Sequence, residues 1–134
     1  MTFISKAFSL IELLIVLTII TVLATLSVVS YQVYVLRSYR AEAVATLLYL
    51  ANKQEQHYAN TGVYSNSFNE LESDVSVLAP RYQLTITLLQ QGQGYELMAE
   101  AAGAQLKDTE CLRLTFNHIG QRNSTEQENL HCWN

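Results

Sequence analysis

Charge is missing from a long stretch near the start of this 134-residue chain, because no Asp, Glu, Lys or Arg occurs between Glu12 and Arg37. Proline is missing from the same stretch, and the only proline of the chain is Pro80. The absence of proline excludes a proline kink, so a helix here keeps all of its hydrogen bonds. About two dozen uncharged residues form a helix of roughly 36 Å, which is enough to cross a bilayer. The sequence therefore predicts a membrane helix in this stretch.

Basic residues are also few. The chain has 8 Lys and Arg against 12 Asp and Glu, and its formal net charge is −4. Non-specific binding to nucleic acid requires clustered Lys and Arg that displace counterions from phosphates. The charge balance therefore argues against nucleic acid as a general partner.

Motifs that would indicate catalysis are absent as well. The sequence contains no glycine-rich phosphate loop and no Ser-His-Asp order, and its carboxylates show no spacing that selects a catalytic pair. His118 and His131 do not have the paired ligand spacing of a structural zinc site. We expect no enzyme activity, no cofactor and no metal.

Cysteine occurs twice, at Cys111 and Cys132, in the last quarter of the chain. A membrane helix with Lys6 on its leader side would place this part of the chain outside the cytoplasm, where disulfides persist. A disulfide between the two cysteines would close a loop worth roughly 3 kcal/mol in the chain-entropy model. The alternative is a pair of reduced, unrelated thiols.

Glu12 is the one acid at the head of the apolar stretch. A carboxylate costs roughly 2.5–3.5 kcal/mol at the centre of a bilayer, so Glu12 must lie near the surface or beside a cation. A cut after Ala7 would create such a cation at the new amino terminus of Phe8. In a bundle of parallel copies Glu12 could also meet the amine of a neighbour, which points to assembly.

The run Lys6–Val16 resembles the cleavage and methylation motif of type IV pilins and pseudopilins. The resemblance implies that a prepilin peptidase cuts between Ala7 and Phe8, that Phe8 is methylated, and that Glu12 pairs with a neighbouring amino terminus in the fibre. Later segments are similar to minor pilins of the PilE kind: Tyr31–Tyr34, Arg37, Ala41–Ala43, Gln54–Glu55, Gly62–Tyr64 and Cys132–Trp133.

The chain departs from this family at three positions. Ala7 stands where the family usually has glycine before the cut, and alanine is small enough that we expect cleavage to persist. Thr21 and Val29 stand where many major pilins have a helix-breaking glycine and proline. The partial unwinding of the helix described for assembled major subunits is therefore not expected to carry over.

Two other kinds of amino-terminal segment compete with the pilin interpretation. A cleaved secretory signal has an apolar run of only 7–15 residues and a positive, not acidic, start. An uncleaved signal anchor would give Glu12 no role. We retain both as alternatives.

The helical pattern continues after Arg37, so one helix is predicted from Phe8 to about Tyr58, ended by Gly62. Its outer half has an apolar stripe that we expect to face a sheet: Ala41, Val44, Ala45, Leu48 and Ala51.

Three strands are predicted after a connecting loop. Residues 82–89 and 95–101 alternate in polarity around a glycine-rich turn, which is typical of an antiparallel hairpin. A third strand is expected over 111–116, with Leu112, Leu114 and Phe116 facing inward. The fold class is therefore α+β: a long amino-terminal helix packed on a small antiparallel sheet, with a disulfide-bounded C-terminal loop. The expected segments are a leader at 1–7, a hydrophobic helix at 8–36 and a head domain at 37–134.

The leading functional hypothesis is a minor pilin that assembles into a type IV pilus and supports adhesion, twitching motility or DNA uptake. Its implied partners are other pilin subunits, a prepilin peptidase and methyltransferase, and an inner-membrane assembly platform. The subunit would reside in the inner membrane as a single-pass protein before it joins the extracellular pilus. A second hypothesis makes the head a receptor for DNA or a surface ligand, and a third is a pseudopilin of type II secretion.

Overall fold

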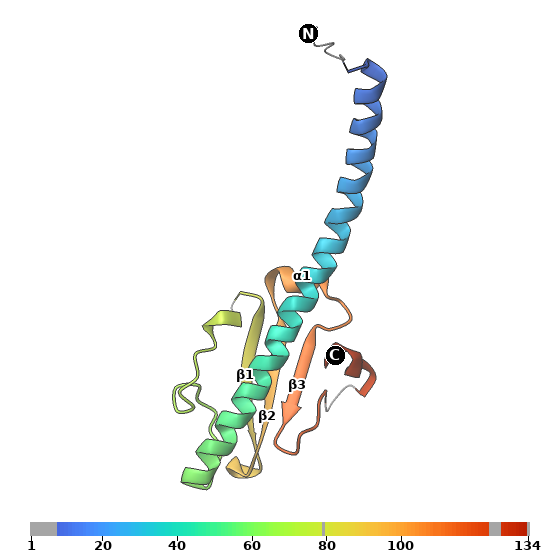
Figure 1. The fold of residues 1–134 in the computed structure, drawn as a ribbon. Coiled ribbons are helices and arrows are strands. Elements are labelled where there is room, and N and C mark those ends of the chain that lie inside the picture. The colour runs from blue at the N-terminus through green and yellow to red at the C-terminus, as the bar shows by residue number, and fades with distance from the viewer. Residues whose placement is uncertain (1–7, 79, 124–126, 134) are drawn as a thin grey trace. The chain divides into compact units, whose positions relative to one another are not determined.

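The computed structural model describes residues 8–78, 80–123 and 127–133 (Figure 1). The chain divides into two units, one up to Val35 and the other from Leu36 onward. The long helix α1, Leu10–Thr61, contributes to both units. The helix begins two residues after the predicted start and ends three residues after the predicted end.

In the first unit, α1 carries apolar side chains that are exposed all round. Leu13, for example, is 57% exposed. The hydroxyls of Thr18, Thr21 and Thr25 donate to backbone carbonyls one turn earlier, at 2.7 to 3.0 Å. These polar groups are therefore satisfied inside the helix, as an apolar environment requires. Among the described residues, α1 is the one helix long and apolar enough to cross a membrane.

In the second unit, the remaining part of α1 lies along a three-stranded antiparallel sheet (Figure 1). The strands are β1 (Tyr82–Leu89), β2 (Gly94–Ala101) and β3 (Arg113–Asn117), and their order in the sheet is β1-β2-β3. Tyr82 is opposite Ala101 in the first pair, and Leu97 is opposite Phe116 in the second. The predicted hairpin is confirmed.

The core lies between α1 and the sheet. Ala43, Leu47 and Leu50 of α1 are fully buried against residues such as Leu97 and Leu114.

The apolar stripe predicted for this part of α1 was partly wrong. Ala41, Ala45 and Leu48 are exposed, whereas Ala51 is buried and Val44 half-buried. Apolar residues occur on both sides of the helix here, so a 3.6-residue period fits more than one stripe. Periodicity alone could not select the buried face.

The third strand was also predicted in part incorrectly. β3 begins at Arg113, and Leu112, expected to face inward, is 40% exposed. Thr115, on the face expected to be outside, is only 3% exposed. The segment after β3 pairs with the free edge of this strand, where the backbone N–H of Asn123 donates to the Thr115 carbonyl at 2.8 Å. Alternation fails because both faces of β3 are buried.

Gly62 ends α1, as predicted. Its φ is +78°, and its N–H donates to the Tyr58 carbonyl at 2.8 Å. A left-handed residue that bonds back into the last turn is a common way for a helix to stop, and glycine adopts this conformation without steric cost.

Candidate functional sites at the amino terminus and in the head

Glu12 lies in the first turn of α1 and bonds to the backbone of its own helix. The N–H of Ser9 donates to Glu12 Oε2 at 3.1 Å, and the Ser9 carbonyl accepts from Leu13 N at 3.2 Å. A Glu three residues after Ser that reaches back to the Ser N–H is one half of a capping box. The carboxylate therefore stabilises the start of the helix, where the helix dipole also favours negative charge.

Sequence reasoning missed this capping role, although the Ser-x-x-Glu spacing was visible. The bond holds the Glu12 carboxylate at the Ser9 nitrogen, one residue from the nitrogen of Phe8. Phe8 itself is exposed, whereas Ala7 lies outside the described residues. The predicted cut, the methylation of Phe8 and the pairing of Glu12 with another subunit stay predictions.

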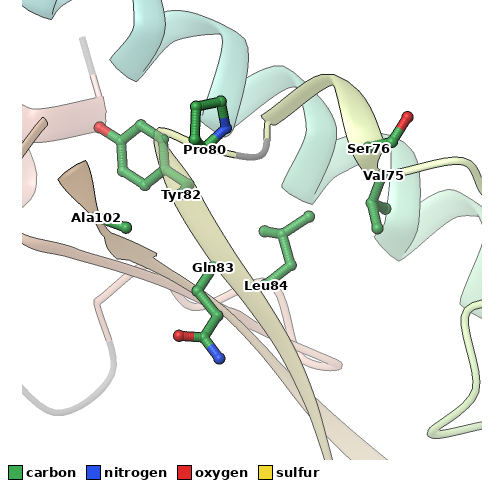
Figure 2. Close-up of a pocket in the computed structure, with 7 residues that line it drawn as sticks. All are labelled: Val75, Ser76, Pro80, Tyr82, Gln83, Leu84 and Ala102. Atoms are coloured by element: carbon green, nitrogen blue, oxygen red, sulfur yellow. The ribbon is translucent and has the colours of Figure 1, made fainter. Parts of the chain in front are cut away.

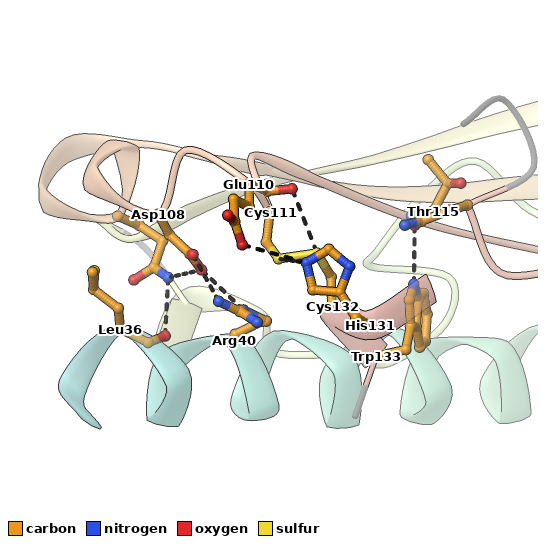
Figure 3. The surroundings of a disulfide bond; sticks show 11 residues. Leu36, Arg40, Asp108, Glu110, Cys111, Thr115, His131, Cys132 and Trp133 are labelled. Atoms are coloured by element: carbon orange, nitrogen blue, oxygen red, sulfur yellow. Dashed lines mark hydrogen bonds and ion pairs between the residues drawn. A yellow bond between two sulfur atoms is a disulfide. The ribbon is translucent and has the colours of Figure 1, made fainter. Parts of the chain in front are cut away.

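In the head, Cys111 and Cys132 form a disulfide, with their Cα atoms 5.7 Å apart (Figure 3). The bond joins the β2–β3 connection, two residues before β3 begins, to the C-terminal 3₁₀ segment, Gln127–Trp133. Both cysteines are fully buried. The predicted disulfide-bounded C-terminal segment is present.

Asn123 fixes the same segment at the free edge of β3. Its side-chain Oδ1 accepts from the indole Nε1 of Trp133 at 2.9 Å and from Thr115 N at 3.1 Å. Trp133 is buried and packs near Phe116, with ring centroids 5.9 Å apart. The tail is thus held by one covalent bond, one buried aromatic ring and one shared amide oxygen.

A buried ion pair attaches the β2–β3 connection to α1. Arg40 donates to both carboxylate oxygens of Asp108, at 2.7 and 2.9 Å, and the two side chains are 14% and 9% exposed. Gln105 Nε2 bonds to Asp108 and to the Leu36 carbonyl, at 3.3 and 3.0 Å. The N–H of Cys111 donates to the Asp108 carbonyl at 2.9 Å. Bidentate pairing of this kind fixes geometry as well as charge, so α1 and the disulfide share one anchor.

Two buried tyrosines have raised pKa values. Burial, followed by the negative charge of Asp108, raises the pKa of Tyr82 to about 12. Burial also raises the pKa of Tyr95, with smaller contributions from Glu55 and Tyr64. Both phenols are therefore neutral at any ordinary pH.

A shallow apolar hollow of about 370 Å³ lies beside β1 (Figure 2). Tyr82 is the only ionisable residue among those that line it: Val75, Ser76, Pro80, Tyr82, Gln83, Leu84 and Ala102. This lining carries no charged side chain at neutral pH, because burial raises the pKa of Tyr82.

Within the described ranges, three side chains that often bind metals converge at Cys111, His131 and Cys132. The two sulfurs are bonded to each other, so this is a disulfide beside a histidine.

Two family models match the chain. The model described as "Type IV minor pilin ComP, DNA uptake sequence receptor" matches residues 29–115, and "Prokaryotic N-terminal methylation motif" matches residues 4–28. No curated protein matches it. A solved structure, "High-Resolution Structure of a Type IV Pilin from Shewanella oneidensis", is similar in fold, with a TM-score of 0.56 and 24% identity. The match covers 74% of this chain and 98% of that one.

The long helix, the antiparallel sheet, the C-terminal disulfide and the methylation motif together define a type IV pilin. The first family match covers more than half of the sequence, so the chain belongs to the type IV minor pilin ComP family. It is a minor pilin, a structural subunit of the pilus. Membership of this family also decides against the pseudopilin hypothesis.

Proposed function

We propose that this minor pilin spans the inner membrane once, is cut between Ala7 and Phe8, and enters the pilus through α1 with Glu12 facing the amine of a neighbour. The observation that carries the proposal is the position of Glu12 at the Ser9 nitrogen, as the one acid in the exposed apolar part of α1 before Arg37. An exposed apolar helix gains stability by packing against like helices, and a carboxylate in that bundle requires a cation.

The partners of this process follow from the motif and the family. Processing requires a prepilin peptidase that also methylates Phe8, and extraction from the membrane requires an assembly platform. The fibre itself supplies other pilin subunits.

Two substitutions of Glu12 separate its capping role from pairing. Glu12→Gln keeps an oxygen that accepts the Ser9 N–H but removes the charge, whereas Glu12→Ala removes both. If Glu12 pairs with an amine, both variants accumulate in the membrane and are depleted from sheared pili, measured by immunoblot against wild type. If the Gln variant enters pili normally, charge pairing is refuted and only the capping role stands.

The family description favours DNA reception by the head as a second function. Two basic side chains are already engaged, since Arg40 pairs with Asp108 and Arg113 lies 3.3 Å from Glu100. Arg122, exposed beside the Trp133 ring at 5.3 Å, combines a cation with an aromatic face. We propose that DNA contacts few cations on this head, so specificity must come from contacts other than bulk charge.

A gel-shift assay with the intact, detergent-solubilised chain tests DNA binding. We expect the chain to bind DNA at low salt and more weakly at moderate salt, with a shallow slope of log affinity against log salt concentration. Arg122→Ala should reduce that slope by about one. The neighbouring substitution Gln121→Ala serves as the matched control. If the chain causes no shift at low salt, DNA reception by the head is rejected, and the proposal that the chain enters the pilus still stands.

A further inference from the structure

His131 lies directly beside the disulfide of the head. Its Nε2 is 3.6 Å from Cys132 Sγ and 3.9 Å from Cys111 Sγ (Figure 3). The cysteines are buried, whereas the imidazole is 54% exposed. One ring nitrogen is thus close to both sulfurs, on a side chain that solvent reaches, which suits a group that carries protons away from thiols.

Glu110 lies on the open side of the same nitrogen. Its Oε2 is 3.6 Å from His131 Nε2, and its side chain is 81% exposed. The other charged pair near Cys111 is Arg40 with Asp108, whose charges are satisfied by each other. A proton accepted by His131 would therefore lie between a sulfur and a carboxylate.

Contacts other than the disulfide also hold this arrangement. Trp133, two residues after His131, is buried and bonded to Asn123 at 2.9 Å. Cys111 is held by the bond from its N–H to Asp108. Both sides of the pair are thus positioned by groups that do not require the sulfur–sulfur bond.

We propose that His131 is a general base for closure of the Cys111–Cys132 disulfide, so that the head catalyses a step of its own maturation. The oxidant is a disulfide-bearing donor, either a small molecule or a protein. This activity is independent of pilus assembly and of DNA binding.

The reaction comprises two thiol–disulfide exchanges. His131 takes the proton of one cysteine, and the thiolate attacks a sulfur of the donor. The donor bond breaks, a mixed disulfide forms, and the departing donor thiolate takes up a proton. The second cysteine is deprotonated in the same way and attacks the protein-side sulfur of the mixed disulfide. The Cys111–Cys132 bond forms and the remaining donor thiolate leaves and is protonated, so two cysteines are oxidised and one disulfide is reduced to two thiols.

Ordinary acidities explain why a base is useful here. A free cysteine has a pKa near 8.5, so only a few per cent is thiolate at neutral pH, whereas an imidazole with a pKa near 6.5 is mostly neutral and able to accept a proton. The base can therefore increase the rate of disulfide closure by at most tens of fold near pH 7. At a pH where the thiols ionise without a base, the increase disappears.

The test measures the closure rate of the reduced full-length chain in detergent, with oxidised glutathione as donor, from pH 6 to about pH 9.5. We expect His131→Gln to close roughly tenfold more slowly than wild type near pH 7 and at the wild-type rate near pH 9.5. His57→Gln, the same chemical change in α1, is the matched control and should follow the wild-type profile. Equal rates at pH 7, or the same loss at every pH, would overturn the proposal.

Glu110→Gln provides a second test, because this exposed side chain can change without affecting the fold. It should slow closure about two- to threefold near pH 7 and not at all near pH 9.5, since the imidazolium loses its carboxylate. If Glu110→Gln closes at the wild-type rate at pH 7, the carboxylate has no part in the mechanism. If folded His131→Gln also closes at the wild-type rate, the whole proposal is refuted.

Discussion

At the scale of single residues, Asn123 shows how one side chain organises the C-terminal segment. Its Oδ1 accepts from both Trp133 Nε1 and Thr115 N. Neither donor can reach water easily, because both residues are buried. Asn123 thus takes the place of a fourth strand at the free edge of β3.

Asn123→Ala is therefore expected to lower the free energy of unfolding by about 2 kcal/mol, since it leaves two buried donors unsatisfied. Asn123→Asp keeps an acceptor oxygen in the same place and should lose clearly less. Urea unfolding of the detergent-solubilised chain, followed by Trp133 fluorescence, measures both. Equal losses in the two variants would show that the oxygen is not what holds the tail.

The buried tyrosines predict a loss of stability in alkali. The folded pKa of Tyr82 is about 12, above the ordinary value of 10.0, and that of Tyr95 is also raised. A raised folded pKa contributes stability that is complete below the unfolded pKa and is lost as pH rises through the folded one. The melting temperature should thus be insensitive to these groups below pH 10 and fall between about 10 and 12.

In Tyr82→Phe the melting temperature should fall less steeply over this alkaline range. The part of the phenolate absorbance that belongs to Tyr82 and Tyr95 should appear only as the head unfolds. Ionisation of all eight tyrosines near pH 10 in a folded head would contradict the assigned burial.

At the scale of elements, the disulfide closes the segment from Cys111 to Cys132, a separation of 21 residues. A loop of this size is worth roughly 3 kcal/mol in the chain-entropy model. Cys111→Ser with Cys132→Ser should lower the free energy of unfolding by about that amount, measured in urea against the oxidised wild type. A loss below about 1 kcal/mol would mean that Trp133 and Asn123 restrain the tail without the bond.

The elements also show what could be predicted from the sequence. Four features could be predicted because each depends on local chemistry or on only two residues. They are the long helix, its end at Gly62, the β1–β2 hairpin and the pairing of Cys111 with Cys132. The buried stripe of α1 and the inward face of β3 could not be predicted. Both depend on what packs against the element. The alternation of apolar residues in β3 contains no information about the later segment that folds back onto Thr115.

The amino-terminal site divides in the same way. The motif assigns roles to Phe8 and Glu12 that stay predictions, whereas the bond from the Ser9 N–H to Glu12 was missed because the acid was interpreted only as a charge near a membrane. A helix terminus has unsatisfied donors whatever surrounds it, so capping should be considered before pairing. The anchor of Arg40 with Asp108 joins residues far apart in the sequence and carries no local signal.

At the scale of the whole molecule, the chain combines an exposed apolar helix with a head closed by its own disulfide. The first part is unstable in water unless a bilayer or like helices cover it, whereas the second has its own buried core. This division suits a subunit that leaves a membrane for a fibre while its head stays folded. Membership of the minor pilin family agrees with it.

The central claim is that the mature chain is a processed, oxidised subunit of the pilus. Intact mass spectrometry of the protein from sheared pili tests this claim most directly. The account predicts a chain that begins at methylated Phe8 and is lighter by the two hydrogens lost from Cys111 and Cys132. A full-length, unmethylated chain found only in the membrane fraction would contradict it.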